Sequence, residues 1–98
     1  MAVRTTNLYG KITVTGRAIR DVANQALREA YGIAYGRVSA LDADPDENKI
    51  YMNLRLVLKY GVNPEAICES VRSTVKYNVE NFTGASVTVI NTYVVGIK

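Results

Sequence analysis

The chain contains no histidine, no tryptophan and a single cysteine, Cys68. Without histidine and with one thiol, the usual zinc and transition-metal sites are excluded, as are serine or cysteine nucleophiles that depend on a histidine base. One cysteine also excludes an internal disulfide framework. No glycine-rich loop of the kind that binds phosphates is present. The composition therefore predicts that the protein is not an enzyme and has no catalytic residues, no metal site and no cofactor.

Long hydrophobic runs are missing as well. No stretch of 18 apolar residues occurs, and the first residues lack the apolar segment of a signal peptide. We therefore expect a cytoplasmic protein with no membrane span. A length of 98 residues, 48% of them hydrophobic, suits one small domain with a single core. We predict one domain over residues 1–98, with residues 1–8 flexible.

Negative charge is scarce outside one short segment. The net charge is +3, and four of the nine acidic residues lie between positions 42 and 47. Asp42, Asp44 and Asp46 resemble the first half of a calcium-binding loop. The pattern then fails, because Glu47 stands where the loop needs glycine and Asn53 stands where it needs glutamate. A solvated turn between two strands is the preferred interpretation.

The spacing of the apolar residues predicts six elements. They are a strand at 9–15, a helix from 16 to about 31, strands at 33–41 and 49–60, a helix between Asn63 and Gly84, and a strand at 86–97. Gly36 is expected to mark a bulge or bend in the second strand. The predicted fold class is α+β: a two-layer sandwich with two helices on one face of a sheet of three to four strands. Its order is strand, helix, strand, strand, helix, strand.

Two apolar patterns define the expected core. In the strand at 49–60, every second residue is apolar: Ile50, Met52, Leu54, Leu56 and Leu58. In the second helix, the expected apolar stripe consists of Ile67, Val71, Val75, Val79 and Phe82. Asn63 suits the N-cap of that helix, Pro64 its first position and Gly84 its end.

The polar face of the strand at 49–60 is the candidate interface. Tyr51, Arg55 and Lys59 share this face, and Tyr93 or Lys11 is expected on a neighbouring strand. A plain solvent-exposed face, a protein interface and a nucleic-acid-binding face all fit this combination. Nucleic acid is the least favoured, because the aromatic motif of RNA-recognition sheets and the Gly-x-x-Gly loop of KH domains are both absent.

Five segments of the chain resemble a known family. They are Tyr9–Ile12, the glycine-bracketed turn Tyr31–Gly36, the strand Leu56–Val62 with its Tyr-Gly ending, the helical segment Val71–Gly84 and the closing strand Val87–Ile97. The chain resembles the alkaline-shock, or envelope-stress-response, protein family, found mainly in Gram-positive bacteria. The similarity covers nearly the whole chain from Tyr9 onward. It is strongest from Leu56 onward, where several spaced motifs agree in order and phase.

The resemblance implies a non-enzymatic scaffolding protein in cell-envelope stress or homeostasis. It further implies self-association into homo-oligomers and recruitment to the membrane periphery by a separate, membrane-anchored partner protein. A link to lipid metabolism in some members leaves a fatty-acyl carrier as another alternative. No catalytic residues transfer from the family. Many relatives have long polar tails and a larger central insertion that these 98 residues do not show. The resemblance is therefore not expected to extend to contacts made through such tails.

Overall fold

The computed structural model describes residues 16–44 and 46–98. It contains, in order, α1 (Gly16–Glu29), β1 (Ile33–Asp44), β2 (Lys49–Leu58), α2 (Pro64–Thr83) and β3 (Ser86–Ile97). This order, α-β-β-α-β, confirms the predicted α+β class and all five elements that fall in the described part. The strand predicted at 9–15 and the flexible segment predicted at 1–8 lie outside the described residues.

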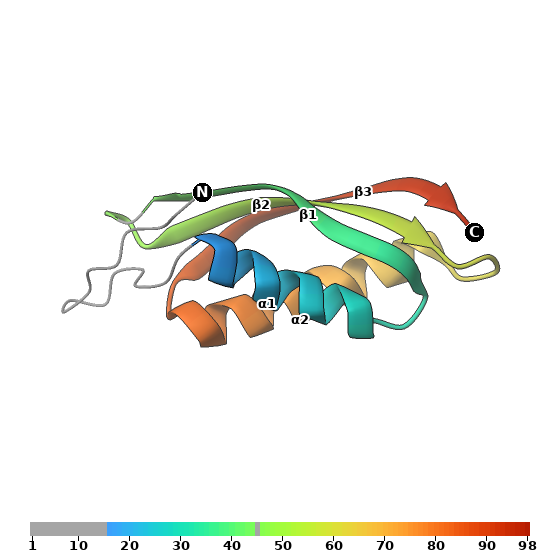
Figure 1. Cartoon of the computed structure of the whole chain (residues 1–98), viewed down its shortest axis with the longest axis horizontal. Helices are drawn as coiled ribbons and strands as arrows, with labels where there is room; N and C mark the ends of the chain where they lie inside the picture. The colour runs from blue at the N-terminus through green and yellow to red at the C-terminus, as the bar shows by residue number, and fades with distance from the viewer. Residues whose placement is uncertain (1–15, 45) are drawn as a thin grey trace.

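The three strands form one mixed sheet in the order β1-β2-β3. β1 and β2 are antiparallel neighbours joined by a short turn, whereas β2 and β3 are parallel and are joined through α2. A parallel pair requires such a crossover, because the chain must return to the starting end of the sheet. Both helices lie on the same face of the sheet (Figure 1). The other face carries no helix among the described residues, so its side chains are presented outward.

The core lies between the two layers. The five alternating apolar residues of β2 are all buried, as predicted, with exposed fractions of 2% or less. Ile19, Ala23 and Leu27 of α1 belong to the same buried cluster, in which α1 packs against β1 and α2. Small alanines and a glycine let the helix approach closely: a Cβ built on Gly36 would lie 3.1 Å from Leu56 Cδ2 and 3.4 Å from Leu27 Cβ.

Helix α2 begins and ends as its sequence predicts. The Asn63 side chain accepts hydrogen bonds from the backbone N–H groups of Glu65 and Ala66, at 3.0 and 3.3 Å. These bonds satisfy donors that have no partner inside the helix. At the other end, Gly84 takes the left-handed conformation, with φ 75°, and its N–H donates to the Glu80 carbonyl.

The prediction that Phe82 belongs to the buried stripe of α2 is wrong. Phe82 is 46% exposed, and Thr83 is buried in its place. The stripe continues at intervals of four residues from Val79 to Thr83, because this interval keeps successive side chains on the face that meets the sheet. The Thr83 hydroxyl donates to the Val79 carbonyl and accepts from the Ala85 N–H, so its burial leaves no unsatisfied group.

The predicted bounds of the two hairpin strands also need correction. β1 continues to Asp44, three residues beyond the predicted end, because Asp42, Ala43 and Asp44 pair with the start of β2. β2 ends at Leu58 rather than residue 60. The irregularities in the pairing of β1 fall between Ile33 and Tyr35 and between Val38 and Ala40, on either side of Gly36 rather than at it.

Candidate interaction surface

The sheet face opposite the helices, here named the open face, carries three of the four predicted interface residues: Tyr51, Arg55 and Tyr93. The β2 side chains on this face alternate with the buried ones, since successive residues of a strand point to opposite sides. Cross-strand pairing arranges the face in rows: Tyr35–Val57–Gly96, Arg37–Arg55–Tyr93, Ala40–Asn53–Asn91 and Asp42–Tyr51–Val89. The second, third and fourth of these are named the arginine row, the middle row and the aspartate row.

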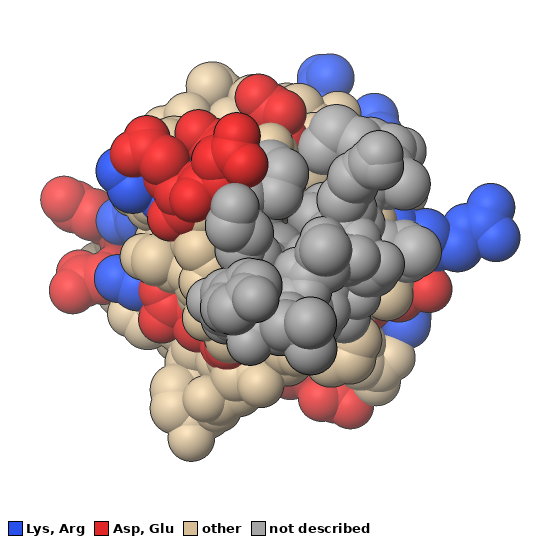
Figure 2. Space-filling model, turned by 90° about the vertical axis from the view of Figure 1, so that its left-hand side faces the viewer, with Lys and Arg blue, Asp and Glu red and all other residues tan. Residues whose placement is uncertain are grey.

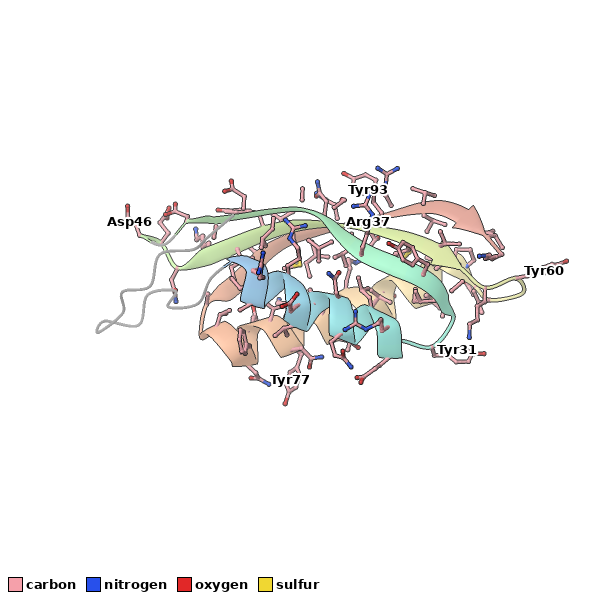
Figure 3. The ribbon with its side chains drawn as sticks, viewed as in Figure 1. Tyr31, Arg37, Asp46, Tyr60, Tyr77 and Tyr93 are labelled. Atoms are coloured by element: carbon pink, nitrogen blue, oxygen red, sulfur yellow. The ribbon has the colours of Figure 1, made fainter. Side chains whose placement is uncertain are left out.

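The arginine row joins two predicted residues to one that the sequence analysis missed. Arg55 pairs with Tyr93 on β3, as expected, and with Arg37 on β1. All three side chains are exposed, and Figure 3 shows Arg37 and Tyr93 on the side of the sheet away from the helices. No acidic side chain of the described residues forms an ion pair with either arginine. Like charges directly opposite each other on neighbouring strands are destabilising, so this pair is a candidate for binding an acidic partner.

The alternation of β1 could have indicated Arg37, but the correct pairing also depends on a bulge. Between Val38 and Ala40 the register shifts by one residue, which leaves Ser39 without a pairing partner on β2. The Ser39 hydroxyl donates to the Asn53 carbonyl at 3.3 Å. Sequence alternation alone carries no signal for such an inserted residue.

Tyr51 lies in the aspartate row, on the other side of the middle row from Arg55. It is half-buried, and with Asp42 and Val89 it lines a shallow hollow of about 150 Å³. In the middle row, Asn91 Nδ2 donates to Asn53 Oδ1 at 3.0 Å, which ties β3 to β2 across the open face. Tyr51 is therefore separated from Arg55 by an asparagine pair.

Lys59 lies apart from the other predicted interface residues. It follows the end of β2 and is exposed, and its backbone N–H donates to the Gly32 carbonyl at 2.8 Å. Tyr31 and Tyr60 occupy the same end of the molecule and are 84% and 78% exposed (Figure 3). The structure therefore brings Arg55 and Tyr93 together, with Tyr51 on the same face, and places Lys59 at one end.

Acidic side chains gather at the opposite end (Figure 2). They belong to the β1–β2 turn and the strand ends beside it, with Asp46 at the tip (Figure 3). Asp44 Oδ1 accepts hydrogen bonds from the backbone N–H groups of Asp46 and Glu47, and Glu47 forms an ion pair with Lys49 at 3.5 Å. In residues 16–44 and 46–98, no three Cys, Asp or Glu side chains are grouped so that they could hold a metal ion.

The two outer strands of the sheet differ in how their edges are covered. At Val38 of β1, the backbone N–H donates to Asn24 Oδ1 and the carbonyl accepts from Arg20 Nη1, so side chains of α1 cover that edge. β3 carries exposed apolar side chains, among them Val94 and Val95. An edge strand of this composition can pair with another chain.

These features define a class of protein: a small α+β domain whose sheet presents one face and one edge for contacts. The model of the alkaline shock protein 23 family, described as having a cell envelope-related function, matches residues 37–98. The chain belongs to this family, which confirms the resemblance found in the sequence. None of the described helices is both long and apolar enough to cross a membrane.

Known proteins give further likenesses. The chain is 23% identical over 117 residues to the uncharacterized protein YloU of Bacillus subtilis (strain 168), covering all of this chain and 97% of YloU. Among solved structures, a copper form and a nickel form of MamM CTD variants each match with a TM-score of 0.56 and 16% identity. They cover 82% of this chain and 95% and 96% of MamM CTD. At this identity, the likeness to MamM CTD concerns the fold alone.

Proposed function

We propose that the chain is a non-enzymatic scaffolding protein of cell-envelope homeostasis, which self-associates in the cytoplasm and is recruited to the membrane by an anchored partner protein. Membership of a family with a cell envelope-related function supports the setting. The absence of histidine from the sequence supports the non-enzymatic part, because the commonest general base and metal ligand is missing.

The observation that carries the scaffolding role is the open face. Tyr93 is 49% exposed and Val95 52% exposed, and with Arg55 and Ser39 they line a hollow of about 320 Å³. Exposed tyrosine and arginine are enriched at protein interfaces, where they contribute a large share of the binding energy. A helical layer buries the other face of the same sheet, so a partner protein is the natural cover for this one.

Sedimentation velocity across a wide concentration range tests this proposal on the full chain. We expect the weight-average mass to rise with concentration, as in reversible self-association. A mass that stays at one chain throughout would contradict self-association. Capture of a membrane-anchored partner by the purified protein would then be the remaining support for a scaffold.

A nucleic-acid-binding module is the second candidate, favoured by the arginine row. Two guanidinium groups beside Tyr93 could contact a phosphate backbone while the ring stacks on a base. Binding to a fluorescent single-stranded oligonucleotide, measured by anisotropy, should then weaken steeply with salt and on Arg55→Glu or Lys59→Glu. Absent or salt-insensitive binding would exclude this function.

A further inference from the structure

We propose that the open face binds the open face of a second copy of this chain, in a dimer with two-fold symmetry. The two-fold axis lies between the two sheets, runs across the strands and passes over the middle row. This inference rests on the proposed self-association and specifies one of its contacts. In such a dimer each strand lies over the same strand of the other copy with its direction reversed, in the manner of two packed sheets.

The charges of the open face are arranged for this rotation. The arginine row and the aspartate row lie two β2 residues on either side of Asn53, which is about 7 Å along the strand. Rotation about the middle row therefore places Arg37 of each copy over Asp42 of the other. The interface then contains two arginine–aspartate pairs. In each pair, the attraction between Arg37 and Asp42 offsets the repulsion between Arg37 and Arg55 of the same chain.

The other residues of the arginine and aspartate rows match as well. The same rotation places Arg55 over Tyr51 of the second copy, where a guanidinium can stack on the ring. It places Tyr93 over Val89, beside the hollow of about 150 Å³ that Asp42, Tyr51 and Val89 line. Each tyrosine can then fill the hollow of the other copy, as a knob fills a hole. Packed sheets lie about 10 Å apart, a gap that arginine and tyrosine side chains span.

The alternative two-fold axis, along the strands, is disfavoured by the same residues. That rotation leaves each row over itself and exchanges β1 with β3. It would place Arg55 of one copy against Arg55 of the other at the centre of the interface, because β2 is the middle strand. Two unpaired guanidinium groups buried in contact would oppose association.

A nucleic acid fits the open face less well than a second copy does. Asp42 lies two rows from the arginines, on the same face as both and on the same strand as Arg37, with Asp44 beyond it at the end of β1. A strand of phosphates that followed the sheet would meet these carboxylates. A second copy of this chain carries both signs of charge, and its strands run in the opposite direction. Its aspartate row therefore lies over the arginine row, and its arginine row over the aspartate row.

Charge exchange between Arg37 and Asp42 tests the dimer by sedimentation velocity. We expect Arg37→Glu alone and Asp42→Arg alone each to weaken dimerisation by about tenfold or more, because each places like charges in contact twice. The two single variants mixed in equal amounts should form a heterodimer, and the variant with both substitutions should dimerise about as the wild type does. Lys76→Glu, on the exposed side of α2, makes the same change in net charge as Arg37→Glu and should leave dimerisation unchanged.

Circular dichroism and thermal unfolding of each variant separate a lost interface from a lost fold. Tyr93→Ser provides a second test of the interface. It removes the side chain that fills the hollow of the other copy without changing the net charge, and it should also weaken the dimer by about tenfold. Wild-type self-association that these substitutions do not weaken, or that mixing does not restore, would overturn the face-to-face dimer and leave the scaffolding proposal standing. A wild type that stays monomeric would contradict both. Loss of oligonucleotide binding in Arg37→Glu, with dimerisation intact, would assign the arginine row to nucleic acid instead.

Discussion

Single residues at the turns fix how the two layers meet. Gly32, between α1 and β1, and Gly61, between β2 and α2, have φ angles of 83° and 92°, which side-chain-bearing residues rarely adopt. Their surroundings differ. A Cβ on Gly32 would lie 2.6 Å from Ile67 Cδ1, whereas a Cβ on Gly61 would meet nothing within 4 Å. The first glycine is required for conformation and for space, the second for conformation alone.

Alanine at these two positions separates the two costs. We expect Gly61→Ala to lower the free energy of unfolding by about 1 kcal/mol, through backbone strain. Gly32→Ala should lower it by about 2–3 kcal/mol, because Ile67 must also move away from the new methyl group. Urea denaturation of both variants measures the difference, with Gly61→Ala as the control. Equal losses would show that the core around Ile67 accommodates the methyl group at no cost.

At the scale of elements, the buried and the exposed side of helix α2 meet between two adjacent residues at its C-terminal end, Phe82 and Thr83. Val79 is fully buried, whereas Phe82 is 46% exposed and lines a groove between α1 and α2. The size of the aromatic side chain does not decide its place. The position on the helix does, because only the residues spaced by four from Ile67 face the sheet.

Side-chain size alone suggests that truncating Phe82 costs more stability than truncating Val79. We expect the opposite order. We expect Val79→Ala to lower the free energy of unfolding by about 2 kcal/mol, since it leaves a cavity in the core. Phe82→Ala should cost less than about 1 kcal/mol, although it removes many more atoms. Thermal and urea unfolding provide the measurement. A larger loss for Phe82→Ala would mean that the groove between the helices is part of the core.

The same contrast explains which elements the sequence predicts well. The alternation in β2 and the caps of α2 are local signals, so the sequence correctly predicts the buried face of β2 and the start and end of α2. Phe82 lies three residues after Val79 and Thr83 lies four residues after it. Both spacings occur on one face of a helix, so sequence periodicity cannot decide which of the two is buried. In β1, the extension to Asp44 depends on pairing with Lys49, Ile50 and Tyr51, which is tertiary information.

The candidate interface could be predicted only in part, for the same reason. The face shared by Tyr51 and Arg55 follows from alternation within one strand. The contribution of Arg37 depends on the bulge at Ser39, and the placement of Tyr93 beside Arg55 depends on the register of a parallel pair joined through a helix. Lys59 continues the alternation of Tyr51 and Arg55 in the sequence, but β2 ends at Leu58. The alternating pattern therefore extends one residue further than the strand does.

On the scale of the whole molecule, the three strands differ in how many neighbours hold them. β2 is paired on both sides and its inward side chains are all buried, while β1 and β3 are each paired on one side among the described strands. The backbone N–H groups of β2 are therefore the least accessible to local opening.

Hydrogen exchange should reveal this order. We expect the amides of Leu54 and Leu56 to exchange most slowly, at rates set by global unfolding, and those near the end of β3 to exchange faster through local separation of the strand. Exchange measured residue by residue in dilute protein provides the test, and a series of concentrations serves as the control, because self-association adds protection. Slower exchange in β3 than in β2 at the lowest concentration would contradict the central role of β2.

The parallel pairing of β2 with β3 also has a consequence for biosynthesis. The hairpin of β1 and β2 can form as soon as residue 58 is available, but β2 gains its second neighbour only after α2 and then β3 have left the ribosome. Until then, one edge of the central strand and much of the apolar stripe of α2 are open to other chains. We therefore expect a nascent chain stalled before residue 86 to bind chaperones, and a fragment released without β3 to aggregate.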